Sequence, residues 1–127
     1  MRIIGHGIDI VEVGRIERLL EDPERDFVDG AFTSLEQSLA PGSPAHARYF
    51  AGRLAGKEAV VKALGTGFSH GVAWIDIEIG RGASGEPTVT LSERALEIAF
   101  DLAVSQWLLS ISHSDAFAVA SAIAVAG

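Results

Sequence analysis

The 127-residue chain contains no cysteine, which excludes a disulfide framework and any cysteine-based metal or redox site. Long apolar runs are also missing. Residues 1–9 interrupt their apolar stretch with glycines and an aspartate, a pattern that fits neither a signal peptide nor a membrane span. Prolines number four and 48% of residues are apolar, so we expect a folded protein rather than a disordered one. The length predicts one domain, residues 1–127, with a cytoplasmic location as the default.

Positive charge is scarce and unevenly placed. The net charge of −7 argues against general nucleic-acid binding. Four of the ten basic residues nevertheless fall within fifteen positions: Arg48, Arg53, Lys57 and Lys62. An acidic protein with one concentrated basic stretch suits a small phosphate-bearing ligand better than a polyanion.

Residues 48–64 are predicted to form the helix around which the rest of the chain is organised, ending at Gly65. One side of this helix carries large apolar residues. The other side is almost entirely small, with alanine at every fourth position from Ala47 to Ala63. Because the helix has no wide polar face, we expect it to be buried, and its charges then need partners. They either face a ligand or metal, or form a Glu58–Lys62 ion pair while the others extend outward.

The flanking segments predict an α+β fold, in which a small antiparallel sheet of hairpins packs on the central helix. Apolar periodicity predicts helices at 14–22 and 93–104, and a capping box from Thr33 to Glu36 begins a third, short one. Phe27 and Phe32 are expected to plug the core from an irregular segment. Alternating residues predict strands at 2–13, 72–79, 88–91, 106–112 and 117–125.

Alternation also assigns faces. In the predicted strand 72–79, the isoleucines face one way and Asp76 the other; in helix 93–104, the inward residues are Leu96, Ala99, Leu102 and Ala103. The last strand has alanine at every even position from 116 to 124, so a helix could lie unusually close, and the alanine side of the central helix is a candidate partner.

The first strand places Gly5, Gly7 and Asp9 on one face. The glycines either leave room for a bulky group beside the backbone or mark a bulge, and Asp9 could cap a local turn. His6 shares the opposite, apolar face, which favours a core or interface histidine over a ligand. Arg15 and Arg18 share an exposed face of the first helix, and solvation is the simplest interpretation of their spacing.

Three blocks in this order and spacing, GHGIDIV at 5–11, RLAGKEAVVKALGTG at 53–67 and SISHS at 110–114, resemble the holo-acyl-carrier-protein synthases, which are the short 4′-phosphopantetheinyl transferases. The resemblance spans essentially the whole chain. It implies transfer of 4′-phosphopantetheine from coenzyme A to a serine of apo acyl carrier protein, with release of adenosine 3′,5′-bisphosphate. It also implies a homotrimer with sites at the subunit interfaces.

The resemblance implies roles for individual residues. Asp9 and Glu58 would hold Mg²⁺ and, together with Lys62, carry out catalysis. Coenzyme A would contact Arg53, Lys57, Gly65, Thr66, Gly67, Gly85, Pro87 and His113. The chain departs from the family pattern at His6, Leu54, Gly56 and Ser84, none of which is a metal or phosphate ligand.

The partner implied by the resemblance is strongly acidic, so docking on a chain of net charge −7 requires a local basic patch, for which Arg15 and Arg18 are the candidates. Two other classes compete with the transferase: a metal-free scaffold that binds coenzyme A or a carrier, and a Mg²⁺-dependent phosphohydrolase. A scaffold needs no metal-bridging acids, so Asp9, Glu58 and Lys62 together argue against it. The residues leave the identity of the general base open.

Overall fold

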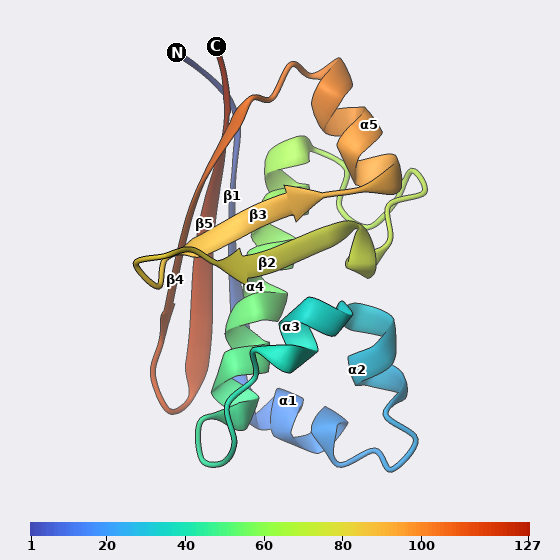
Figure 1. Cartoon of the computed structure of the whole chain (residues 1–127), viewed down its shortest axis with the longest axis vertical. Helices are drawn as coiled ribbons and strands as arrows, with labels where there is room; N and C mark the ends of the chain where they lie inside the picture. Colours follow the sequence, from blue (N-terminus) through green and yellow to red (C-terminus); the bar gives the residue numbers. More distant parts are fainter.

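The computed structural model describes all 127 residues (Figure 1). Its elements in chain order are β1 (Arg2–Glu12), α1 (Val13–Leu20), α2 (Asp26–Ala31), α3 (Ser34–Ser38), α4 (His46–Leu64), the 3₁₀ helix η1 (Trp74–Asp76), β2 (Ile77–Arg81), β3 (Pro87–Leu91), α5 (Glu93–Asp101), β4 (Gln106–His113) and β5 (Phe117–Ala126). No helix is both long and apolar enough to span a bilayer.

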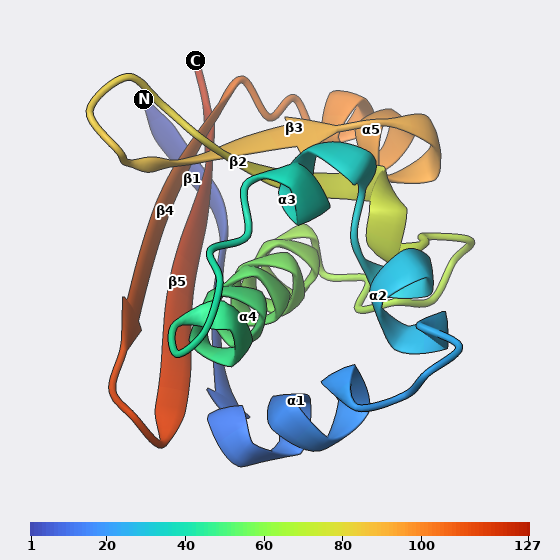
Figure 2. The ribbon, with the colours of Figure 1, turned by 60° about the horizontal axis from the view of Figure 1, so that its bottom comes forward.

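Helix α4 lies between two antiparallel sheets. One sheet has the strand order β1-β5-β4, and the other is the β2–β3 hairpin. The three-stranded sheet packs along one side of α4, and the hairpin crosses it from another direction (Figure 1). Helices α1, α2 and α3 gather around the N-terminal half of α4, while α5 lies beyond the hairpin (Figure 2). The predicted α+β class and the central position of the helix are confirmed.

Small residues bring α4 and the sheet to backbone contact. A β-carbon added at Gly5 would lie 2.0 Å from the carbonyl oxygen of Ala63, and one at Gly7 would lie 1.9 Å from that of Ala59. The inward face of β5 consists of fully buried alanines, Ala118, Ala120, Ala122 and Ala124. The group that approaches the glycines is therefore α4 itself, and the predicted pairing of the two alanine surfaces is confirmed.

The far face of the three-stranded sheet is apolar and uncovered. Its exposed large residues include Ile3, Ile8, Ile10, Leu108 and Phe117. His6 is on this face too, where its Nε2 lies 3.0 Å from the Ser121 hydroxyl. His6 is thus exposed in the single chain, and the core alternative for it is wrong.

The segment predicted as a strand at 72–79 begins as the 3₁₀ helix η1 instead. The Asp76 carboxylate accepts a hydrogen bond from the Ala73 N–H at 3.1 Å, which closes a turn. The turn changes the faces of two residues, since Asp76 is buried at 6% exposure and Ile75 is 48% exposed, whereas Ile77 and Ile79 are buried as predicted. The strand starts only at Ile77.

Two helical predictions also need correction. Helix α5 buries Ala95 and Ala99, the second as predicted, while Leu96 is 52% exposed, because the helix packs on η1 and α4 through its small residues. The helix ends at Asp101, so Leu102 and Ala103 belong to the turn that follows and do not face inward. The segment around Phe27, expected to be irregular, forms the short helix α2.

Candidate active site

A cavity of about 590 Å³ opens between the end of β1, helices α1 and α2, and one side of α4. Asp9, Arg15, Glu58 and Lys62 line it, and we call it the carboxylate cavity. The rest of its wall is largely apolar, from Ile10, Val11, Leu19, Phe27, Ala31, Leu54 and Trp74. Three residues predicted to carry the chemistry therefore face one space.

Asp9 and Lys62 meet because β1 and α4 approach so closely. Asp9 follows Gly7 on the same face of the strand, and Lys62 lies between Ala59 and Ala63, whose carbonyls face the glycines. The Lys62 Nζ donates to Asp9 Oδ1 at 3.0 Å and to the Ile8 carbonyl at 2.9 Å. The ion pair of Lys62 is thus with Asp9, and the alternative Glu58–Lys62 pair does not form.

The surroundings of Glu58 disfavour the charged form of its carboxyl group. Burial raises the pKa of the Glu58 carboxyl, and the charge of Asp9 raises it further, whereas Lys62 and Arg15 oppose the rise. Asp9 and Glu58 are two of the three carboxylates that line the cavity, with Asp26, and neighbouring carboxylates attract a cation. Mg²⁺ is commonly held by one or two carboxylates, with waters and substrate phosphates completing its ligands. The pair of Asp9 and Glu58 fits that ion, although the chain groups no three His, Cys, Asp or Glu side chains that could hold a metal ion by themselves.

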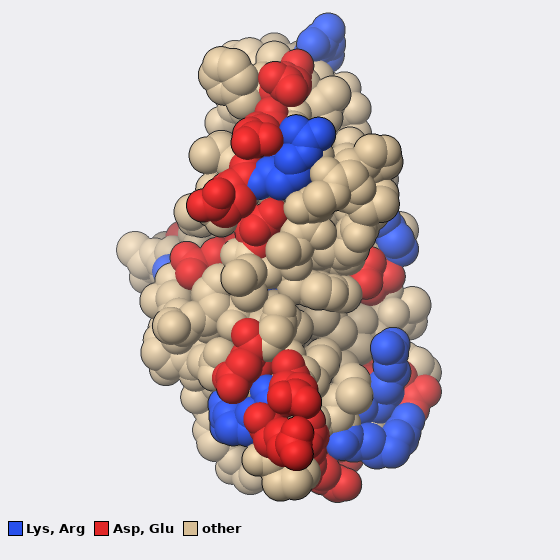
Figure 3. All heavy atoms as spheres, turned by 90° about the vertical axis from the view of Figure 1, so that its right-hand side faces the viewer, with Lys and Arg blue, Asp and Glu red and all other residues tan.

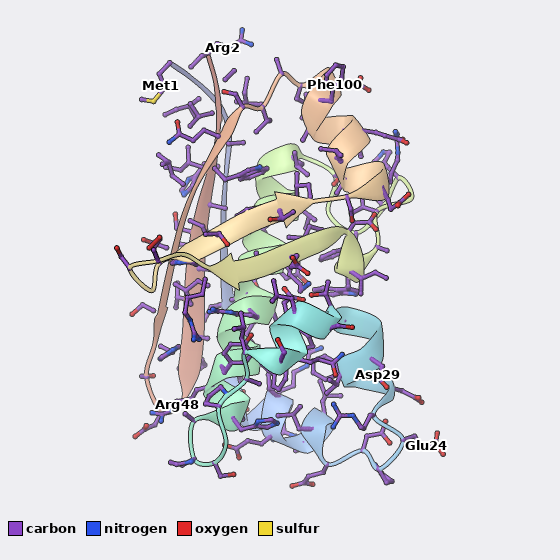
Figure 4. All side chains as sticks on the ribbon, in the orientation of Figure 1. Met1, Arg2, Glu24, Asp29, Arg48 and Phe100 are labelled. Carbon is purple, nitrogen blue, oxygen red and sulfur yellow. The ribbon has the colours of Figure 1, made fainter.

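A second cavity, of about 300 Å³, lies at the N-terminal half of α4 and is lined by basic side chains. Arg48, Arg53, Arg81 and His113 surround it, and we call it the arginine cavity. Arg48 projects at the lower end of α4 (Figure 4) and pairs with Asp115 at 3.1 Å. The Arg53 guanidinium stacks over the ring of Tyr49 at 4.7 Å, and its buried Nε has no hydrogen-bond partner.

The arginine cavity joins residues that are distant in sequence. Arg53 and His113 were predicted to contact one ligand, and the structure brings them together. No role was predicted for Arg81, and Arg48 was predicted only as part of the basic stretch. Arg81 is the last residue of β2 and carries no motif of its own. A buried donor without a partner is costly in a folded protein, which marks this cavity as ready for an anion.

The two cavities share no lining residue, so one chain does not bring all its predicted site residues together. Gly65 ends α4 with a left-handed backbone, and Thr66 and Gly67 follow it. Gly85 lies in the β2–β3 turn, and Pro87 lines a third cavity of about 420 Å³ against β4 and β5. These residues belong to neither of the first two cavities.

Lys57 does not line a ligand site, and its predicted contact with coenzyme A is wrong. Its side chain is fully buried, and its Nζ contacts Glu36 Oε1 at 2.7 Å. The other two donors of the ammonium go to the carbonyls of Trp74 and Ile77. Because a lysine ammonium has three donors, none remains for a ligand.

Arg15 and Arg18 are both exposed on α1, as predicted. They differ in their surroundings: Arg15 lines the carboxylate cavity, and Arg18 lies 3.8 Å from Glu12 on the outside. Figure 3 shows acidic and basic side chains interspersed at the α1–α2 end of the molecule. The basic surface there is local and does not form a broad patch.

Comparison with known proteins agrees with this geometry. The model of the 4′-phosphopantetheinyl transferase superfamily matches residues 5–122. A holo-[acyl-carrier-protein] synthase of Alkaliphilus metalliredigens is 46% identical over 122 residues, which are 96% of this chain and 98% of that one. The synthase of Protochlamydia amoebophila is 41% identical over 94% of this chain and 96% of its own.

Solved structures show the same fold. The holo-(acyl-carrier-protein) synthase of Bacillus anthracis, in complex with CoA (3′,5′-ADP), superposes with a TM-score of 0.82 at 35% identity over 98% of both chains. The enzyme of Helicobacter pylori, in complex with coenzyme A, gives 0.83 at 30% identity over 94% of this chain and 99% of that one. With the family model covering nearly its whole length and curated relatives above 40% identity, this chain belongs to the 4′-phosphopantetheinyl transferase superfamily and is an enzyme of the holo-[acyl-carrier-protein] synthase type.

Proposed function

We propose that this enzyme transfers 4′-phosphopantetheine from coenzyme A to a serine hydroxyl of apo acyl carrier protein and releases adenosine 3′,5′-bisphosphate. The observation that carries the proposal is the meeting of Asp9, Glu58 and Lys62 in one cavity. Phosphoryl transfer depends on positioning and charge neutralisation more than on covalent help from the protein, and these three side chains offer both. Coenzyme A in the B. anthracis and H. pylori relatives supports the donor.

Asp9 and Glu58 would hold Mg²⁺, which when bound neutralises phosphate charge as it develops. The Lys62 ammonium is already at the cavity, hydrogen-bonded to Asp9, and has donors to offer to phosphate oxygens. Arg15 adds a second cation at the rim. The apolar wall that includes Leu54 and Trp74 limits the water that reaches the reacting atoms.

The arginine cavity is the candidate site for the anionic nucleotide end of coenzyme A. Arg53 and His113 lie there as the resemblance implies, and Arg48 and Arg81 add charge. Guanidinium groups suit phosphate because their planar donors match its oxygens in pairs. The remaining predicted contacts, from 65–67 and from the turn with Gly85 and Pro87, stay part of this proposal.

A homotrimer with sites shared between subunits reconciles two features of the single chain. The carboxylate and arginine cavities share no residue, so one ligand could span the first cavity of one subunit and the second of its neighbour. The far face of the β1-β5-β4 sheet is apolar and uncovered, which suits a subunit interface. If the site is shared, specific activity falls on dilution below the subunit dissociation constant, whereas a fully active monomer in light scattering contradicts it.

The direct test is the mass of apo acyl carrier protein incubated with the enzyme, coenzyme A and Mg²⁺. Transfer adds about 340 Da to the carrier, the mass of the phosphopantetheinyl group. Cleavage of coenzyme A with no gain in carrier mass indicates a phosphohydrolase, and binding without either change indicates a scaffold. Repeating the assay over fatty-acid and polyketide carriers identifies the preferred acceptor.

A further inference from the structure

A buried ion pair lies directly behind the carboxylate cavity and has no part in the function proposed so far. Lys57 and Glu36 both have side chains that are 0% exposed, and their charged atoms are 2.7 Å apart. Lys57 precedes Glu58 on α4, so the two side chains leave the helix about 100° apart. One points into the protein and the other into the cavity.

Every hydrogen-bonding group of the pair is engaged by a different segment. Glu36 Oε1 accepts from the Thr33 N–H at 2.8 Å, and Oε2 accepts from the Ile79 N–H at 2.7 Å. The Lys57 ammonium donates to the carbonyls of Trp74, at 3.1 Å, and Ile77. The pair therefore joins three segments to α4 at Lys57: the start of α3, the turn η1 and strand β2.

The turn η1 connects this point to the cavity wall. The Trp74 carbonyl accepts a hydrogen bond from Lys57, and Trp74 lines the carboxylate cavity together with Glu58, the one acid of α4. The indole also stacks on Phe68, with ring centroids 3.7 Å apart, so its position follows that of the turn. A change at the pair thus reaches both Glu58, through the helix, and Trp74, through the turn.

Packing alone does not explain a charged pair at this position. A buried ion pair has a large desolvation penalty, and hydrophobic residues of similar volume often give equal or greater stability. Fully satisfied buried polar networks instead select one arrangement of the segments that they join. Of the segments joined here, α4 and η1 also line the carboxylate cavity, through Glu58 and Trp74.

We propose that Lys57 and Glu36 are positioning residues, whose buried pair sets the orientation of α4 against η1 and so fixes Glu58 relative to the Trp74 wall of the carboxylate cavity. The inference rests on the proposed phosphopantetheinyl transfer. Neither residue contacts the substrate.

The test replaces the pair by neutral groups of similar shape, in the double variant Lys57→Met/Glu36→Gln. The glutamine keeps one acceptor oxygen, for either the Thr33 or the Ile79 N–H, and methionine fills the volume of the lysine stem. We expect a folded protein whose kcat for transfer falls about tenfold or more while its KM for coenzyme A stays within about threefold, because misplaced reacting groups lower the rate more than binding. The matched control is Arg94→Met/Glu97→Gln, which removes the exposed pair on α5 and should leave both constants unchanged.

A second readout needs no substrate. The chain has two tryptophans, so in a Trp107→Phe background the emission reports on Trp74 alone. The double variant should shift that emission, and the α5 control should not. A folded double variant with wild-type kcat, or with unchanged Trp74 emission, overturns the proposal.

Two further outcomes are also decisive. If the double variant does not fold, Lys57→Gln/Glu36→Gln decides, because it leaves no buried charge unpaired and its amides keep a donor for the carbonyls and an acceptor for a backbone N–H: unchanged kcat and emission overturn the proposal, and a fall in kcat with shifted emission supports it. If wild-type enzyme adds no phosphopantetheine to any carrier, the proposed function fails, while the emission of Trp74 still shows whether the pair positions the cavity wall.

Discussion

The two sides of helix α4 are held in place by opposite means. On the side of α4 that faces the three-stranded sheet, contact depends on residues without a side chain. Gly5 and Gly7 let backbone carbonyls of the helix lie against strand β1. Toward α3 and the hairpin, contact depends on a fully buried charge, that of Lys57. On the first side the half-exposed ammonium of Lys62 adds hydrogen bonds to the Ile8 carbonyl and to Asp9, whereas the second side is built around a charge that is fully buried.

The difference explains why the helix lacks an ordinary polar face. On the sheet side, a carbon added at Gly5 or Gly7 meets backbone, which cannot move without shifting the helix. On the other side, size is less restrictive, and charge and hydrogen-bonding capacity are what the surroundings require. The carboxylate cavity lies where these sides meet, since Asp9 comes from the glycine-bearing strand and Glu58 follows Lys57. Each side can therefore be perturbed separately.

The most damaging change should be on the sheet side. In Gly7→Ala the new β-carbon would lie 1.9 Å from the Ala59 carbonyl oxygen and 2.8 Å from the Lys62 β-carbon. Forced separation of β1 from α4 should lower the free energy of unfolding by about 3 kcal/mol or more, measured by urea denaturation. Gly42→Ala is the control, with nothing within 4 Å of its added carbon. Equal stability of the two variants would refute the close approach.

The cavity between the two sides should be next in sensitivity, through activity rather than stability. Asp9→Asn and Glu58→Gln should each reduce kcat about 100-fold or more, because each removes charge from the proposed Mg²⁺ site. The double variant should be little worse than either single one, since groups that act as a unit are not additive. Steady-state kinetics over a range of Mg²⁺ concentrations measures this, and losses that multiply would mean that the acids act separately.

Carrier docking should respond by a smaller factor. Arg15 lines the carboxylate cavity and Arg18 lies outside it beside Glu12, so Arg15→Glu should raise the KM for an acidic carrier about tenfold and Arg18→Glu less. The KM for coenzyme A should change little. Added salt should weaken carrier binding by the wild type more than by Arg15→Glu, since screening acts on the attraction that the variant lacks. Equal salt dependence of the two would place docking elsewhere.

Gly56→Ala is a useful contrast with Gly7→Ala, because it adds the same methyl group on the more tolerant side. Its nearest neighbours would be the flexible side chains of Ile79 and Ile111, both at 3.5 Å, which is an ordinary contact. Since glycine is unfavourable inside a helix, we expect a gain of about 0.5–1 kcal/mol in urea denaturation. A loss of stability would show that this side is packed as tightly as the sheet side.

The smallest expected effect concerns the pH dependence of stability. Because the pKa of Glu58 is raised in the folded state, the folded chain keeps this proton to higher pH than the unfolded chain does. The resulting stabilisation is present below the pKa of an unfolded glutamate and is lost as pH rises through the folded pKa. Without divalent cations, Glu58→Gln should thus melt slightly above wild type near pH 7 and equal it near about pH 4. A melting difference that is constant over this range would contradict the assignment.

Local signals in the sequence were sufficient for much of this organisation. Gly5 and Gly7 predicted a close approach between β1 and another group. The alanines of the last strand and of the central helix predicted that these two elements pack together, because small residues at a regular spacing can be read directly from the sequence. The Thr33–Glu36 capping box formed as predicted. Asp9, Glu58 and Lys62 were grouped through the resemblance, and they do line one cavity.

Long-range partners were not recoverable in the same way. We expected the charges of the buried central helix to need partners, yet the partner of Lys57, Glu36, lies 21 positions earlier and was predicted only as part of a cap. Within 72–79, Ile77 and Ile79 face inward as predicted, but the turn closed by Asp76 exposes Ile75 and buries Asp76. In α5 the choice between alanines and leucines for the inward face depends on how closely η1 and α4 approach it, which only the assembled tertiary structure determines.

The order of strands in the larger sheet has a consequence for biosynthesis. Strand β1 pairs only with β5, and Arg2 lies opposite Ala126 in that pairing. Strand β1 can therefore join the sheet only after β5 has been synthesised. While the chain emerges from the ribosome, the glycine strand and α4 have no alanine strand to complete their sheet. Pairing between such distant segments is slow, and the unpaired edge is prone to association with other chains in the meantime. The three-stranded sheet can therefore be completed only after β5 has been synthesised.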